Sequence, residues 1–124
     1  MKNHLIEGIG IFIWNDNKRY IGEYHNELKD GFGIFYTNDG RNYAGFWKEG
    51  KQNGPGVVTN IYGQKYYVKF NMGEKLTGTS FSIEEKNEID KMILEGEKET
   101  RKRLSSLVVG SELNNYTETQ VKMM

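Results

Sequence analysis

Short stretches in which apolar residues alternate with small or polar ones follow each other from Gly8 to Phe70. In Tyr20–Tyr24 and again in Tyr43–Trp47, aromatic residues and a glycine occupy every second position, which places them on one face of a strand. Turn-forming residues such as Asn38-Asp39-Gly40 separate the stretches. The pattern predicts six strands, near residues 8–14, 19–25, 31–37, 43–48, 54–60 and 66–70. Because the connections are short, we expect a mainly β fold, a single twisted antiparallel meander.

An internal repeat at a constant spacing organises this sheet over residues 8–73. The repeat maps Tyr20 onto Tyr43 and Tyr66, and Gly33 onto Gly56. We interpret the aromatic residues and glycines of this face as the core of the repeats. The predicted core residues are Phe12, Tyr20, Gly22, Tyr24, Gly33, Phe35, Tyr43, Gly45, Trp47, Gly54, Gly56, Tyr66 and Phe70.

Alternation of rings and glycines predicts a specific packing. If Tyr24 lies opposite Gly33 and Gly22 lies opposite Phe35, each ring covers a glycine on the neighbouring strand. Glycine leaves room for the ring, and the ring shields the bare backbone. A buried ring contributes about 150–250 Å² of contact area, so a thin sheet can be stable without a large globular core.

The opposite face of the predicted sheet is also apolar, although a one-sided sheet should be polar towards solvent. In the proposed register Phe32 pairs with Phe46, which neighbours Val57, and Val57 neighbours Tyr67. Contiguous exposed apolar surface usually marks an interface. The predicted partner-binding residues are Ile9, Ile11, Ile13, Ile21, Phe32, Ile34, Tyr36, Phe46, Val57 and Tyr67.

Residues 82–109 are prone to form helix, between the sheet and a polar tail at 110–124 that we expect to be flexible. Ser82 and Glu85 fit a capping box. Apolar residues form one stripe around Ile89 and a second around Leu104, and Gly96 followed by a charged run separates them. Two interpretations stay open: this helix covers its own sheet, or a partner protein covers much of that face.

Composition limits the function. The chain has 124 residues, a formal net charge of zero and no cysteine, which argues against a dedicated nucleic-acid binder and excludes disulfides. Two histidines are too few for a His-dominated metal site. We find no catalytic constellation, and Gly31-x-Gly33 lacks the third glycine of a dinucleotide fingerprint, so we expect no enzyme and no cofactor. Residues 1–7, an N-terminal extension, lack the apolar core of a signal peptide, which favours an intracellular protein.

Residues 43–50 read Tyr-x-Gly-x-Trp-x-x-Gly, followed by Gly54-x-Gly56. This pattern resembles the MORN repeat. Residues 20–33 match it less completely, and residues 66–73 less again, because Val68 replaces the glycine and Phe70 the tryptophan. The resemblance implies a non-enzymatic scaffold that binds other protein subunits, in a cytoskeletal or ciliary assembly such as the radial spoke. It leaves two alternatives: a module that binds membrane surfaces, and a regulatory module for a separate enzyme.

The array begins with the second half of a repeat unit, at Gly8-Ile9-Gly10. Strand 8–14 is therefore an edge strand that neither proline nor lysine protects. An unprotected edge can pair with a strand of another chain, so self-association through this edge is a further expectation. The alternative is that residues 1–7 fold over the edge.

Overall fold

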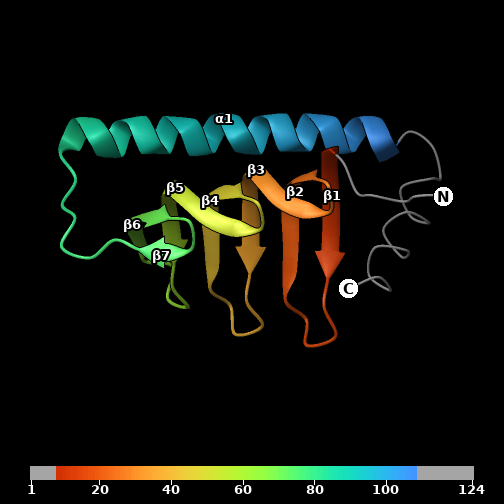
Figure 1. Ribbon diagram of the computed structural model, residues 1–124, viewed down its shortest axis with the longest axis horizontal. Coiled ribbons are helices and arrows are strands. Elements are labelled where there is room, and N and C mark those ends of the chain that lie inside the picture. Colours follow the sequence, from red (N-terminus) through yellow and green to blue (C-terminus); the bar gives the residue numbers. More distant parts are fainter. Residues whose placement is uncertain (1–7, 109–124) are drawn as a thin grey trace.

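The computed structural model describes residues 8–108, and they form one antiparallel sheet followed by one helix (Figure 1). The strand order in the sheet is the order along the chain. The elements are β1 (Gly8–Ile13), β2 (Arg19–His25), β3 (Leu28–Tyr36), β4 (Asn42–Lys48), β5 (Lys51–Thr59), β6 (Lys65–Asn71), β7 (Glu74–Lys75) and α1 (Ile83–Val108). The predicted meander and its C-terminal helix are confirmed. The N-terminal extension at 1–7 and the tail at 110–124 lie outside the described residues.

Strands β3 and β5 begin earlier than predicted, at Leu28 and Lys51, because tight turns join them to the strands before. His25 pairs with Leu28, and the two residues between them, Asn26 and Glu27, both have positive φ. Two successive positive φ values are the geometry of the hairpin turn whose twist matches that of the strands. The turns at 49–50 and 72–73 have the same signs of φ.

The centre of the sheet is a row of glycines that crosses the strands. Gly10, Gly22, Gly33, Gly45 and Gly56 pair in succession, and Val68 ends the row. The tyrosine rings lie directly on this row. A Cβ atom added to Gly33 would stand 2.0 Å from the Tyr20 hydroxyl, and one added to Gly56 would stand 2.5 Å from the Tyr43 ring. The expected packing of rings on glycines is therefore present.

The predicted register of that packing is wrong. Gly22 pairs with Gly33 rather than with Phe35, and Tyr24 pairs with Lys29 rather than with Gly33. The cause is the hairpin turn, in which only Asn26 and Glu27 separate the paired residues His25 and Leu28, whereas the predicted register needs a longer loop. An irregularity of the ladder between Gly22 and Tyr24, which recurs one repeat later between Gly45 and Trp47, reverses part of this shift. In the resulting register, the ring over Gly33 belongs to Tyr20 and not to Tyr24.

The aromatic face carries one of the two apolar cores. Phe12, Tyr20 and Tyr24 are buried, and three partly buried rings pack against them. Two of these, Phe35 and Trp47, have ring centroids 6.4 Å apart, so they share a face as predicted. The indole N–H of Trp47 donates to the Gly33 carbonyl at 3.3 Å.

Helix α1 covers the other face and crosses the strands (Figure 1). Its Ile89 and Ile93 form a core with Phe32, Ala44 and Val57 of the sheet. The two stripes expected on either side of Gly96 belong to one continuous helix. A Cβ atom on Gly96 would lie 2.5 Å from the Phe32 ring, so this glycine lets the helix approach the sheet.

The predicted capping box starts the helix. The Ser82 N–H donates to the Glu85 carboxylate at 2.8 Å, and the Glu85 N–H donates to Ser82 Oγ at 3.1 Å. These reciprocal bonds satisfy donors that the first turn leaves without a helical partner. They also hold the pKa of Glu85 below its usual value.

Candidate protein-binding surface

The structure divides the predicted partner-binding residues into a covered and an open group. Ile9, Phe32 and Val57 are buried, and Phe32 is only 3% exposed. Of the two interpretations that the sequence left open, the structure has the one in which α1 covers its own sheet. The open or half-buried group consists of Ile11, Ile13, Ile21, Ile34, Tyr36, Phe46 and Tyr67.

The pairing expected on this face is correct in two of three places. Phe32 pairs with Phe46, with ring centroids 5.8 Å apart, and Val57 pairs with Tyr67. Phe46 does not neighbour Val57, however, because Val57 pairs with Ala44. The cause is again the tight turn, because Lys48 pairs with Lys51 across only two residues.

Polar contacts fix α1 at both ends of the sheet. The Tyr67 hydroxyl of β6 donates to the two Asp90 carboxylate oxygens at 2.7 and 2.8 Å, which raises the pKa of Tyr67. At the other end, Arg103 lies 3.6 Å from the Glu23 carboxylate of β2, which also accepts the Phe32 N–H at 3.2 Å. Both ions of this pair are more than a third exposed, so it orients the helix and adds little stability.

Beside the helix, half-buried side chains remain as an apolar strip over the first three strands. Ile11, Ile21 and Ile34 are directly opposite one another across β1, β2 and β3. Ile13 and Tyr36 continue the strip one row nearer the hairpin turns, where the Arg19 guanidinium lies 4.3 Å from the Tyr36 ring centroid. We call these five aliphatic and aromatic residues the apolar strip.

A hollow of about 440 Å³ adjoins the apolar strip between the sheet and α1. It lies over Ala44, the smallest residue in the row that also holds Ile34 and Val57. The helix side of the hollow is formed by Ile93 and Leu94, with two carboxylates at the rim. Its lining is Ile34, Tyr36, Asn42, Ala44, Val57, Thr59, Lys65, Asp90, Ile93, Leu94 and Glu97.

On the aromatic face, the predicted core residues come together with one exception. Tyr43 contacts the rings of both Trp47 and Phe70, at 5.5 Å between centroids. Burial raises the pKa of Tyr43 to about 12. Tyr66 is the exception, because it is 51% exposed and lies outside the aromatic core.

Lys29 is a residue of this face that was not among those predicted from the sequence. Its ammonium lies 5.2 to 5.4 Å from the ring centroids of Trp14, Tyr20 and Trp47. Rings attract a cation at this distance, while burial lowers the pKa of Lys29. The internal repeat indicates this position in the sequence, because the spacing that relates Tyr20 to Tyr43 maps Lys29 onto two other long polar residues, Gln52 and Lys75.

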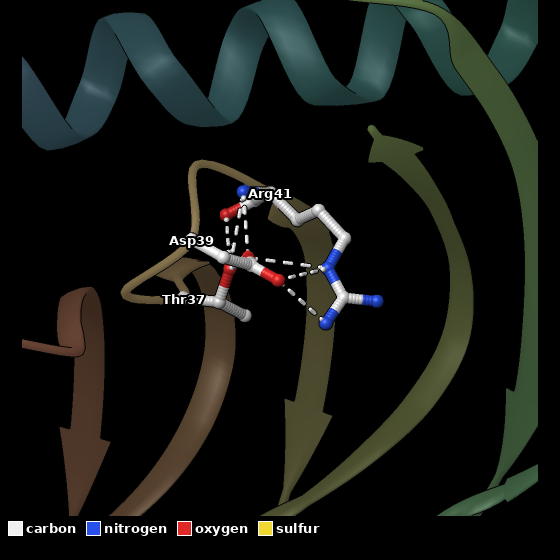
Figure 2. A network of polar contacts seen from close by, with 3 residues as sticks. All are labelled: Thr37, Asp39 and Arg41. Carbon is white, nitrogen blue, oxygen red and sulfur yellow. Dashed lines mark hydrogen bonds and ion pairs between the residues drawn. The ribbon is translucent and has the colours of Figure 1, made fainter. Parts of the chain in front are cut away.

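The hairpin turns at the far end of the strands differ in chemistry. In the β3–β4 turn the Asp39 carboxylate accepts the Thr37 hydroxyl and binds Arg41 at 2.9 Å (Figure 2). These contacts lower the pKa of Asp39 to about 2. The β1–β2 turn has a similar pair, Asp16 and Lys18, at 3.2 Å. The β5–β6 turn has Ile61 and Tyr62 instead, both exposed, and neither was predicted as a site residue.

Comparison with known proteins agrees with the geometry of the repeats. Within the described residues, no helix is long and apolar enough to cross a membrane. A search of curated proteins finds no match to the chain. The family model of the MORN repeat matches residues 1–19, 20–40 and 43–59. The MORN repeat is a non-catalytic module. These matches include the hairpins β2–β3 and β4–β5 and stop before β6, and on them the chain belongs to the MORN-repeat family.

Proposed function

We propose that this protein is a non-enzymatic scaffold that binds another protein through the apolar strip. The observation that supports this is the half-buried row Ile11, Ile21 and Ile34 beside α1, continued by Ile13 and Tyr36. The helix leaves this row incompletely covered, although it buries Ile9 and Phe32 nearby. Apolar surface that the chain's own helix does not cover is the kind that a partner segment covers.

The biological setting of this scaffold is a second part of the proposal. MORN repeats are typically interaction modules, and the resemblance extends to subunits of cytoskeletal and ciliary assemblies. We propose that the chain is an intracellular subunit of such an assembly. Localisation of the tagged protein in cells of its source organism tests the setting: an association with the cytoskeleton or a cilium supports it, and a diffuse distribution contradicts it.

The binding surface is tested by capture of partners from an extract with the whole chain immobilised. Ile21→Asp places a charge in the middle of the apolar strip and should remove the specific partner. Ile83→Asp is the matched control, because Ile83 is an exposed isoleucine at the start of α1 and outside the strip. Circular dichroism checks that both variants fold. Equal capture by Ile21→Asp and the original chain would contradict this surface.

A membrane-surface module is the second candidate, because Lys98, Arg101 and Lys102 are exposed on the last turns of α1. Glu97 and Glu99 lie among them, which weakens attraction to anionic lipid. Co-sedimentation with vesicles of phosphatidylserine and phosphatidylcholine distinguishes the two functions. If the chain binds the vesicles and Lys98→Glu/Arg101→Glu abolishes this binding, the membrane function is favoured. If the chain does not bind them, the protein scaffold is favoured.

A further inference from the structure

The β5–β6 turn departs from the chemistry of its two counterparts. The repeat that relates Tyr43 to Tyr66 also maps Asn38-Asp39-Gly40 onto Ile61-Tyr62-Gly63. Where the β3–β4 turn has an aspartate paired with an arginine, the β5–β6 turn has Ile61, 54% exposed, and Tyr62, 81% exposed. Two apolar side chains therefore replace polar ones at the most accessible point of a hairpin.

The apolar pair has no part in forming the turn. Asn60 closes it, because its side-chain oxygen accepts the N–H groups of Tyr62 and Gln64 at 2.9 Å each. The backbone adds bonds from the Asn60 N–H to the Gln64 carbonyl at 2.9 Å and from the Gly63 N–H to the Asn60 carbonyl at 3.0 Å. The β3–β4 turn shows that the same array folds with Asn and Asp at these positions. An aromatic residue held at a fixed, exposed place is typical of a contact anchor.

The hollow over Ala44 lies directly next to this turn. Thr59 and Lys65 form the last pair of the β5–β6 ladder before the turn, and both line the hollow. Its lining combines apolar residues such as Ala44 and Leu94 with charged ones, Asp90 and Glu97 from the helix and Lys65 from β6. One patch thus contains a projection formed by Ile61 and Tyr62, a hollow of mixed polarity that suits a tyrosine ring and its hydroxyl, and charges of both signs.

A patch with these contents is complementary to a copy of itself. A twofold dimer brings the same surface of two subunits together, so a projection and a hollow side by side can each meet the other. We propose that this protein forms a twofold homodimer in which Tyr62 of each copy inserts into the hollow of the other copy. In this arrangement the tyrosine ring contacts Ala44 and Leu94, and its hydroxyl faces the Asp90 and Glu97 carboxylates. Lys65 of one copy then faces the same carboxylates of the other.

The proposed contact is small, because each inserted ring buries about 150–250 Å². Interfaces of limited area without a large apolar centre are transient, so we expect a dissociation constant of about 10 µM or weaker. The dimer goes beyond the scaffold function and does not depend on it. The hollow and the apolar strip share Ile34 and Tyr36, but the β5–β6 turn lies outside the apolar strip.

The test is sedimentation of the whole chain between about 1 µM and about 1 mM, a range that brackets a weak dissociation constant. The mass should rise from 14.4 kDa towards twice that value with concentration. Ile61→Asn/Tyr62→Asp gives this turn the residues of the β3–β4 turn, so the fold should be kept. Leu94→Arg fills the hollow from a half-exposed helix position. Each variant alone should be a monomer over the whole range.

Mixing the two variants is the decisive measurement. The turn variant keeps an open hollow and the hollow variant keeps Tyr62, so the mixture regains one of the two contacts and should associate where neither variant does. The control, Ile83→Asn, removes an exposed isoleucine from elsewhere and should dimerise normally. A monomeric original chain at about 1 mM, an unchanged dimer in the turn variant, or equal weakening by the control would overturn the proposal. Loss of the dimer with unchanged capture by the apolar strip separates it from the scaffold function.

Discussion

The first two repeats and the last one contain the same tyrosine in different surroundings. Tyr20 is completely buried and Tyr43 is 5% exposed, whereas Tyr66, the corresponding residue of the last repeat, is 51% exposed. The rings of Tyr20 and Tyr43 lie over the next glycine of their own strands and over a glycine of the following strand. In the last repeat, Val68 occupies the position of the first of these glycines.

The difference lies where the repeat array ends. Val68 is buried and has a side chain where the other two repeats have a glycine under the tyrosine ring, and the Tyr66 ring is exposed. After this repeat, β7 extends only from Glu74 to Lys75 before the chain leaves the sheet. The MORN model likewise matches nothing beyond residue 59. The array therefore ends close to the point where the glycine row ends.

The largest expected effect comes from removing the two tyrosine rings in turn. Tyr20→Ala should lower the free energy of unfolding by about 3–5 kcal/mol, because a fully buried aromatic side chain leaves a cavity. Tyr66→Ala should cost about 0.5 kcal/mol, as exposed positions do. Urea unfolding followed by circular dichroism measures both. Equal losses would show that burial does not distinguish the repeats.

A clash introduced under the ring comes next. Gly33→Ala puts a Cβ atom 2.0 Å from the Tyr20 hydroxyl oxygen, and overpacking of this kind costs about 1–3 kcal/mol. The clash disappears when the ring is absent, so Gly33→Ala should be nearly neutral in a Tyr20→Ala background. The double-mutant cycle in urea measures this coupling. Additive losses would mean that the glycine has another role.

The contacts of helix α1 with the first full repeat and with the last repeat also differ. It contacts the first full repeat closely, through Gly96 and Phe32, and the last repeat through a hydrogen bond between Asp90 and Tyr67. Gly96→Ala would stabilise an exposed helix by about 1 kcal/mol, but here the methyl group meets the Phe32 ring and should destabilise the chain by about 1–2 kcal/mol. Tyr67→Phe should cost about 1 kcal/mol or less. Thermal unfolding monitored by circular dichroism ranks the two, and stabilisation by Gly96→Ala would contradict the close contact.

The smallest effect concerns pH and the hairpin turns. The pKa of Asp39 is lowered to about 2 by the Thr37 hydroxyl and Arg41, so its contribution to stability is present above the ordinary carboxyl pKa of about 3.9. This contribution is lost as the pH falls from that value towards about 2. Asp39→Asn should therefore be slightly less stable than the original chain at neutral pH, and the gap should close in acid. Thermal unfolding at both pH values measures it, and a gap that persists at low pH would contradict the assignment.

Period-two alternation was enough to predict which residues share a face. Trp47 with Phe35, and Phe32 with Phe46, follow from counting along strands and across short hairpins. The register could not be predicted, because neither the two-residue turn after His25 nor the irregularity between Gly22 and Tyr24 leaves a mark in a pattern of period two. Gly96 looked like an interruption of the helix because its reason is a ring on a distant strand. The cover by α1 remained open for the same reason, since a sequence does not show which apolar faces meet.

Because α1 crosses the sheet, its length is related to the number of strands beneath it. The helix runs from Asp90, which contacts β6, to Arg103, which contacts β2. That length of helix spans about 19.5 Å, and four spacings between neighbouring strands span about 19 Å. The rise of the helix therefore matches the spacing of the strands, with about two helical turns for every two strands. A longer array of these repeats under the same helix would need a helix extended in steps of about two turns, because other insertions would rotate its apolar side away from the strands.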